Sequence, residues 1–285
     1  MTAPARVASV LALAVLALVG AGCSGSSSTA ATAPGATGSS GSSGSSGPAL
    51  SLVAIGDSIP YNASFDCPGC VGFVDQYAEA LADATGQQVE TSNLSDHTGL
   101  DLPTLMTELH GFKKQLSSAD AIIVGIAHNT IELNAERPCG TTFDETTSTF
   151  QDWSEITRTC SDRSVARWRP VYDKLYSTIA GWRSGRPTVL LTIDKYNDWV
   201  GWRPAHLTPE QARKTVMFHD AWNRMLCHSA EAHGFTCVDI YHAFNGPHGT
   251  RSLGNLVVAD YTHPSQAGND VIAKALAAQG FAPLA

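Results

Sequence analysis

Two short polar segments carry the side chains that hydrolysis of an ester would need. The segment Gly56–Ser58 follows an apolar run, and the segment Asp260–His263 lies close to the C-terminus. A serine hydroxyl becomes a nucleophile when a nearby base takes its proton, and a carboxylate must hold that base in the correct tautomer. The sequence therefore predicts Ser58 as a nucleophile, His263 as its base and Asp260 as the acid that orients the base.

Such an enzyme also needs hydrogen-bond donors aimed at the negative charge that develops on the carbonyl oxygen. Asn129, in the segment Ala127–Thr130, offers a side-chain amide for this purpose. The backbone N–H of Ser58 is a second candidate, because N–H groups at the start of a helix bind anions. This chemistry needs no cofactor and no metal ion, and the sequence predicts neither.

The elements that would position these residues alternate along the chain. Short apolar runs predict five strands, at residues 50–55, 89–94, 119–126, 188–193 and 235–240. Helical spacing and capping residues predict four helices, at residues 73–84, 165–182, 208–232 and 265–278. The second of these helices would have Pro170 near its start. The alternation predicts an α/β domain with a mostly parallel sheet, in which ligands bind beyond the carboxyl ends of the strands.

The two motifs and their order resemble the GDSL/SGNH hydrolase family. The Gly-Asp-Ser of Gly56–Ser58 lies near the start of the domain, and the Asp-x-x-His-Pro of Asp260–Pro264 lies near its end. The likeness runs from about Val53 to Ala278. It implies a three-layer α/β/α sandwich of flavodoxin-like character, with a five-stranded parallel sheet. It also implies that the chain is a lipase or esterase.

The same resemblance implies an oxyanion hole with three donors. These are the backbone N–H groups of Ser58 and Gly99 and the side-chain amide of Asn129. Thr98 and Leu100 are alternatives to Gly99. The chain departs from the family where Ala127 stands for the usual glycine before Asn129, and where Ile59 stands for the leucine of GDSL.

The first part of the chain has the features of an exported protein. Residues 1–22 resemble a signal peptide, because their apolar run is too short for a helix that spans a bilayer. Small residues before Cys23 resemble a bacterial lipobox, which predicts lipidation of Cys23, with plain secretion as the alternative. Residues 23–48 are rich in Ser and Gly and predict a disordered linker, which leaves 49–285 as one folded domain. The expected location is the outer face of the bacterial cell membrane, or outside the cell.

Cysteine content agrees with export, because six cysteines remain after Cys23. An even number in an exported chain suggests three disulfides, although six cysteines allow many pairings. We expect pairing between nearest neighbours, which gives Cys67–Cys70, Cys139–Cys160 and Cys227–Cys237. A redox dithiol or a zinc site at Cys67–Cys70 is the alternative, but no second Cys pair or His pair stands beside it. The resemblance extends to secreted actinobacterial lipases, which carry three disulfides.

The charge of the chain limits the kinds of partner that are expected. The net charge is −8 and the Lys and Arg residues do not cluster, so nucleic-acid binding is not expected. The expected partner is an ester substrate, with the membrane reached only through a lipid anchor, and the chain is expected to be a monomer.

The pocket is expected to be shaped by segments 95–118, 131–163 and 195–207. Four aromatic residues are expected either to line an acyl groove or to pack in the core, namely Trp153, Tyr196, Trp199 and Trp202.

Two other functions remain open from the sequence. The same residues would serve an acyltransferase, or a deacetylase acting on the acyl groups of sugars or lipids. A surface lipoprotein that binds a ligand without catalysis is the alternative from a different class of protein.

Overall fold

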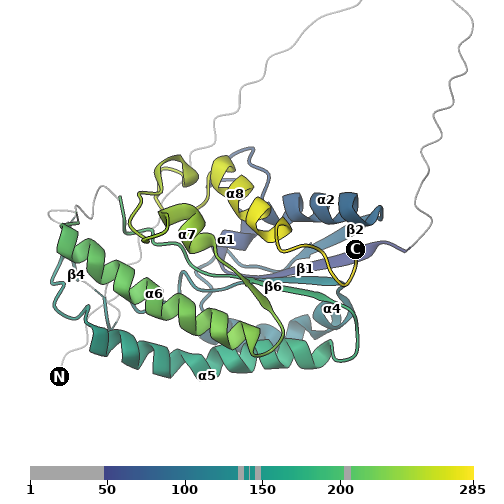
Figure 1. Ribbon diagram of the computed structural model, residues 1–285, viewed down its shortest axis with the longest axis horizontal. Coiled ribbons are helices and arrows are strands. Elements are labelled where there is room, and N and C mark those ends of the chain that lie inside the picture. Colours follow the sequence, from purple (N-terminus) through teal and green to yellow (C-terminus); the bar gives the residue numbers. More distant parts are fainter. Residues whose placement is uncertain (1–47, 134–137, 141, 145–148, 202–206) are drawn as a thin grey trace, which may run out of the picture. The chain divides into compact units, whose positions relative to one another are not determined.

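The computed structural model describes residues 48–133, 138–140, 142–144, 149–201 and 207–285. Its centre is a five-stranded sheet in which every pairing is parallel, with the order β2-β1-β3-β6-β7 (Figure 1). The strands are β1 (Leu50–Gly56), β2 (Val89–Asn93), β3 (Ala121–Gly125), β6 (Val189–Ile193) and β7 (Thr236–Val238). All five predicted strands are thus confirmed. The expected signal peptide, Cys23, nearly all of the linker, and Trp202 lie outside the described residues.

The strand order places the candidate residues side by side. This order is that of flavodoxin-like sheets, whose order reverses between the first strand and the third, and ligands bind at that point. Here β1 pairs with β2 on one side and β3 on the other, and Gly56 is opposite Gly125 at the carboxyl ends of β1 and β3. Ser58 follows β1 and Asn129 follows β3, so the fold brings both to the reversal point.

Helices cover both faces of the sheet, as the three-layer prediction requires (Figure 1). One face carries α2 (Phe73–Thr85) and α8 (Gln266–Ala277), and the other carries α5 (Arg158–Trp182) and α6 (Pro209–Glu231). Alternate side chains of β1 enter two separate hydrophobic cores, Val53 into one and Leu52 into the other. This alternation follows from the two-residue repeat of a strand.

Helix α5 differs from the prediction, because Pro170 lies in its interior and not near its start. The helix begins one residue after Thr157, whose side chain accepts a hydrogen bond from the backbone N–H of Cys160. A proline removes one helical hydrogen bond and crowds the carbonyl four residues before it. Both Pro170 and Ala166 lie on the exposed side of α5, so that carbonyl is open to water and the helix continues.

Short elements occupy segments in which the sequence predicts only loop. Segment 95–118 contains α3 (Leu102–Glu108), a 3₁₀ turn and α4 (Lys113–Ser118), and segment 131–163 contains the small hairpin of β4 (Thr142–Asp144) and β5 (Thr149–Gln151). Asp101 accepts a hydrogen bond from the N–H of Thr104 and caps α3. That capping residue is the signal from which the helix was predictable.

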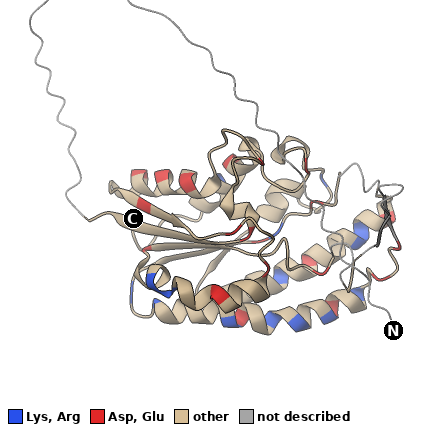
Figure 2. Ribbon diagram, turned by 180° about the vertical axis from the view of Figure 1, so that it is seen from behind, with Lys and Arg blue, Asp and Glu red and all other residues tan. Residues whose placement is uncertain are grey.

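Three disulfides join the described cysteines in the expected nearest-neighbour pairing. The bond between Cys139 and Cys160 connects the 131–163 segment to α5, and the bond between Cys227 and Cys237 connects α6 to β7. Acidic and basic residues are interspersed along α5 and α6 (Figure 2). Within the described part of the chain, every helix is too short or too polar to cross a membrane.

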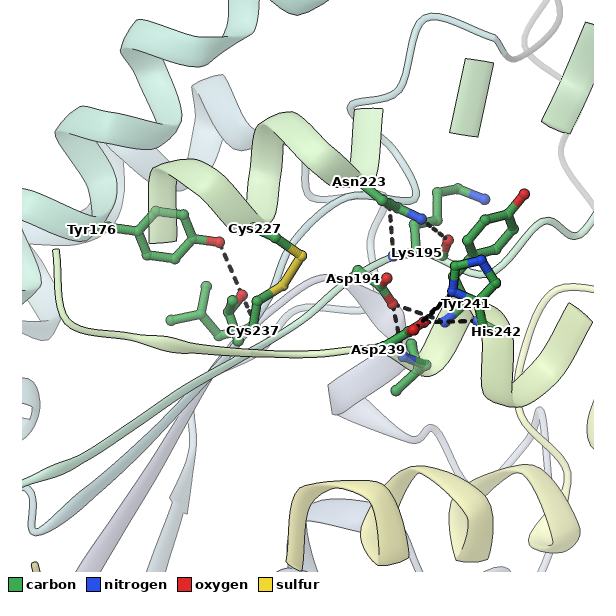
Figure 3. The surroundings of a disulfide bond; sticks show 12 residues. Tyr176, Asp194, Lys195, Asn223, Cys227, Cys237, Asp239, Tyr241 and His242 are labelled. Atoms are coloured by element: carbon green, nitrogen blue, oxygen red, sulfur yellow. Dashed lines mark hydrogen bonds and ion pairs between the residues drawn. A yellow bond between two sulfur atoms is a disulfide. The ribbon is translucent and has the colours of Figure 1, made fainter. Parts of the chain in front are cut away.

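Two buried polar side chains hold the loop that follows β6 (Figure 3). Asn223 of α6 accepts a hydrogen bond from the backbone N–H of Lys195 at 3.1 Å and donates to its carbonyl at 2.8 Å. The carboxyl oxygen Oδ1 of Asp194 accepts from the backbone N–H groups of Ile240 and Tyr241 at 2.8 and 2.9 Å. These two N–H groups open α7 (Ile240–Asn245), so Asp194 links the end of β6 to the segment after β7.

The buried position of Asp194 predicts a stability that falls with rising pH. Burial raises its pKa from 3.8 to about 8, because the charged form is poorly solvated there. Between these two values the native state holds a proton that the unfolded chain has lost. The free energy of unfolding should therefore fall by about 1 kcal/mol per pH unit from pH 5 to 8 and then level off.

Chemical denaturation of the full chain at pH 5, 6, 7, 8 and 9, beside Asp194→Asn, measures this contribution. The asparagine can accept the same backbone hydrogen bonds but does not titrate, so the variant should lose much less stability over the range. Parallel curves for the two proteins would show that Asp194 does not carry the pH dependence.

Candidate active site

Ser58 is the first residue of the short helix α1 (Ser58–Tyr61), which follows β1 after a tight turn at Gly56 and Asp57. The turn is possible because Gly56 has no side chain. A Cβ atom at Gly56 would lie 2.0 Å from the carbonyl oxygen of Gly125 in β3. Only glycine allows this close approach of two backbones. Ser58 is 8% exposed, so its hydroxyl lies at the edge of the folded core.

Asp57 ties the turn of Ser58 to the segment that contains Asn129. Its carboxylate accepts hydrogen bonds from the backbone N–H groups of Ile59, Ala127 and His128, at 3.0 to 3.1 Å. Burial raises the pKa of this carboxyl, and the three backbone hydrogen bonds oppose that rise. The sequence identified Asp57 only as part of a motif. Its structural role depends on contacts between residues about seventy positions apart.

His263 and Asp260 form one compact turn before α8. Asp260 accepts hydrogen bonds from the backbone N–H groups of Thr262 and His263, at 2.8 and 3.0 Å. Tyr261 between them has a positive φ of 64°, which such a tight turn requires. One further hydrogen bond holds this turn to the core, because the buried hydroxyl of Tyr196 donates to the carbonyl of Thr262.

A continuous chain of hydrogen bonds joins the three predicted residues. His263 Nε2 lies 2.9 Å from Ser58 Oγ, and His263 Nδ1 lies 2.6 Å from Asp260 Oδ2. An ionised carboxylate can only accept, so Nδ1 carries the proton and Nε2 is left to accept from the hydroxyl of Ser58. This is the tautomer in which the imidazole can act as a base toward serine.

Electrostatics favour this arrangement. Burial alone would raise the pKa of Asp260, but its hydrogen bonds with His263 and Thr262 outweigh burial and lower it. Burial alone would lower the pKa of His263, but the hydrogen bond and charge of Asp260, with smaller effects from Asp66 and Asp57, raise it. An anion beside Nδ1 thus stabilises the imidazolium that forms when His263 takes a proton.

The predicted oxyanion donors come together in part. Asn129 Nδ2 donates to the carbonyl oxygen of Leu100 at 3.1 Å, which brings the Asn129 segment to the loop that contains Gly99. Gly99 is exposed and has a positive φ of 82°. The backbone N–H of Ser58 belongs to the first residue of α1. The structure thus gathers these segments, and their role toward an oxyanion stays a prediction.

The described aromatic residues proposed for an acyl groove pack in the core. Tyr196, Trp199 and Trp153 are all at least nine-tenths buried. Tyr196 stacks on Phe244 and makes an edge contact with His128, so it supports the site from beneath. Through its hydrogen bond to Thr262, Tyr196 therefore helps to position the turn of Asp260 and His263.

Sequence reasoning missed the side chains that surround His263 on its open side. Tyr61 and Phe65 are exposed apolar residues that follow Ser58 closely in sequence, and both rings contact the ring of His97. His97 stacks on His263 with ring centres 5.9 Å apart. Asp66 Oδ2 lies 3.7 Å from His263 Nε2. Asp66 and His97 lie in different loops, so no spacing in the sequence connects them.

Comparison with known proteins gives the class of the fold. No family model matches the sequence, and no curated protein matches it either. Solved structures do match. A lipase from a goat rumen metagenome is 17% identical, with a TM-score of 0.64 over 83% of this chain and 100% of that chain.

Two further solved structures are also similar in fold to this chain. A putative GDSL-like lipase from Parabacteroides merdae is 13% identical, with a TM-score of 0.54 over 83% of this chain and 96% of that one. An acetylxylan esterase from Geobacillus stearothermophilus is 18% identical, with a TM-score of 0.51 over 83% and 94%. The chain therefore has the three-layer α/β/α fold of the GDSL/SGNH hydrolases.

Proposed function

We propose that this protein is a serine ester hydrolase of the GDSL/SGNH type, with Ser58, His263 and Asp260 as its catalytic triad. The observation that carries the proposal is the chain of hydrogen bonds of 2.9 and 2.6 Å that joins these three residues. The likeness of fold to lipases and to an acetylxylan esterase supports an ester as the substrate.

Hydrolysis proceeds in two steps through an acyl-enzyme. His263 Nε2 takes the proton of Ser58 while Oγ forms a bond to the ester carbonyl carbon, and the carbonyl π electrons move to the oxygen. The tetrahedral intermediate collapses, the C–O bond to the alcohol breaks, and the alcohol leaves with the proton from His263. Water then attacks the acyl-enzyme in the same way and releases the acid.

The oxyanion of the intermediate is stabilised by donors that the fold holds in place. We assign this role to the backbone N–H groups of Ser58 and Gly99 and to the side-chain amide of Asn129. Asp57 fixes the relative position of Ser58 and Asn129 through its three backbone hydrogen bonds. Preorganised donors of this kind provide much of the catalysis in acyl transfer.

Exposed apolar side chains near the nucleophile favour an ester with an apolar part. Phe65 and Tyr61 are 68% and 45% exposed, and both rings contact His97, which stacks on His263. An apolar acyl or alcohol group would cover these rings and remove their surface from water. This favours a lipid or aryl ester over a highly hydrated one.

We further propose that the protein acts outside the cytoplasm. Three disulfides persist only in an oxidising compartment. Cleavage of a signal peptide after residue 22 and lipidation of Cys23 would hold the enzyme at the outer face of the membrane, and secretion without a lipid is the alternative.

Covalent labelling of Ser58 tests the proposed function. A fluorophosphonate probe should add one adduct to the oxidised full chain, because Oγ displaces fluoride from phosphorus. Peptide mass spectrometry should locate the adduct on Ser58, and His263→Ala should label far more slowly. Absence of labelling in the folded protein, or an adduct on another residue, would overturn the assignment. Product analysis with an added alcohol then separates hydrolysis from acyl transfer.

A further inference from the structure

A second imidazole and a second carboxylate face the same nitrogen of His263 that faces Ser58. Asp66 Oδ2 lies 3.1 Å from His97 Nε2 and 3.7 Å from His263 Nε2. One ligand atom from each of these three residues lies within 4.8 Å of the others. Hydrolysis of an ester uses neither Asp66 nor His97.

Local structure fixes each of these side chains. Asp66 directly precedes Cys67, whose disulfide to Cys70 closes a small loop, and its backbone N–H donates to the carbonyl of Ala63 at 3.0 Å. The ring of His97 contacts the rings of Phe65 and Tyr61, at centroid distances of 4.4 and 5.8 Å. The cluster is therefore built by two loops that pack beside the catalytic turn.

We propose that Asp66, His97 and His263 form a binding site for a divalent transition-metal ion of the Zn²⁺ type. Two imidazoles and one carboxylate are ligands that Zn²⁺ prefers, whereas Ca²⁺ and Mg²⁺ prefer oxygen ligands only. Ligand bonds of about 2.0–2.2 Å in a tetrahedron separate the ligand atoms by roughly 3.4 Å. Asp66 Oδ2 lies 3.1 Å from His97 Nε2 and 3.7 Å from His263 Nε2, which are distances on either side of this value.

The hydrogen bond between His263 and Asp260 prepares His263 as a ligand. Metal-binding histidines commonly donate their other N–H to a carboxylate, which fixes the tautomer and the ring orientation. His263 donates through Nδ1 to Asp260 at 2.6 Å, so the lone pair of Nε2 points away from Asp260, and an ion can take it by displacing the hydroxyl of Ser58. The side chains of Asp66, His97 and His263 are 14%, 29% and 20% exposed, so an ion from solvent can reach them.

Occupation of this site would switch off the proposed hydrolysis, and this consequence rests on the proposed function. An ion on His263 Nε2 takes the lone pair that must accept the proton of Ser58. Metal binding and catalysis therefore compete for one atom. Binding itself does not depend on Ser58 acting as a nucleophile, so the metal site and the esterase are testable separately.

Calorimetric titration of the metal-free, oxidised full chain with ZnCl₂ tests the site. We expect one ion per chain, with a Kd in the micromolar range, both in the parent and in Ser58→Ala. His97→Ala and Asp66→Asn should each weaken binding by about tenfold or more, because each removes a direct ligand. Co²⁺ should give the absorption spectrum of a four- or five-coordinate ion in the parent and in Ser58→Ala, but not in His97→Ala or Asp66→Asn. Circular dichroism checks that each variant is folded.

His242→Ala is the matched control, because His242 forms a similar surface pair with Asp239 at 2.8 Å. It should bind Zn²⁺ like the parent. The proposal fails if the parent binds no ion at submillimolar concentration, or if His97→Ala and Asp66→Asn bind as tightly as the parent.

If the parent hydrolyses esters, Zn²⁺ should inhibit it near the measured Kd and EDTA should reverse the inhibition. His97→Ala should resist at that concentration, and its activity in EDTA should stay within a few-fold of the parent's. An inhibition that His97→Ala shares in full would place the inhibiting ion elsewhere.

Discussion

Replacement of Ser58 by alanine is expected to lower kcat for p-nitrophenyl ester hydrolysis by roughly four to six orders of magnitude. The alanine removes the oxygen that lies 2.9 Å from His263 Nε2, and with it the acyl-enzyme route. Residual hydrolysis would come only from water attacking an ester held against the oxyanion donors. KM should change little, because the hydroxyl contributes mainly to the reaction step.

The measurement uses the oxidised full chain with esters from acetate to palmitate. Ser95→Ala is the matched control, because Ser95 is also 8% exposed and lies in the loop after β2. That variant should keep activity within a few-fold of the parent. Both variants should unfold at nearly the parent's denaturant concentration, which separates loss of chemistry from loss of fold.

Two other outcomes would contradict the proposed role of Ser58. If the folded parent and Ser58→Ala are equally inert on every chain length, hydrolysis of simple esters is not the function. Acyl transfer to a specific acceptor, or binding without catalysis, then becomes the better proposal. If Ser58→Ala keeps most of the activity, another group is the nucleophile.

The sheet and the candidate catalytic residues could be picked out from the sequence because their signals are local. Each buried strand, such as Ala121–Gly125, is a short apolar run bounded by polar residues or glycine. Ser58 and His263 were identifiable because Ser58 directly follows the first strand and His263 directly precedes the last helix, near opposite ends of the domain. The parallel order then follows from the alternation of strands and helices.

The supporting residues were not predictable, because they act through contacts between distant segments. Asp57 accepts from Ala127 and His128, and Tyr196 donates to Thr262, across separations of more than sixty residues. The residue types at these positions do not show which distant backbone groups they bind. Short helices such as Lys113–Ser118 were missed because six residues are too few for helical periodicity to be recognised.

The motif Asp-x-x-His illustrates the same limit, because the chain contains it twice. Asp239 and His242 have the spacing of Asp260 and His263, and Asp239 accepts from both the backbone N–H and Nδ1 of His242. Local sequence therefore produces the same contacts between Asp and His at two places, once at the start of α7 and once in the turn before α8. Only the position beside Ser58, after the carboxyl end of β1, distinguishes Asp260 and His263 as the candidate pair.

Substitution of Asp260 by asparagine should lower kcat by about two to four orders of magnitude. The amide can rotate and donate to Nδ1, which leaves the proton on Nε2 and prevents it from accepting the proton of Ser58. The variant also lacks the negative charge that stabilises the imidazolium. Asp260 is 41% exposed, so water partly replaces that charge, and we expect a smaller loss than for Ser58→Ala.

Asparagine is a sharper substitution here than alanine, because its carbonyl oxygen can still accept from the backbone N–H groups of Thr262 and His263. The turn should therefore persist while the tautomer changes. Asp239→Asn makes the same change in the other Asp-x-x-His turn and should leave kcat within a few-fold of the parent's. The double variant Ser58→Ala/Asp260→Asn should be no slower than Ser58→Ala, since residues that act as a unit are not additive. Equal activity of Asp260→Asn and Asp239→Asn would show that Asp260 does not orient the base.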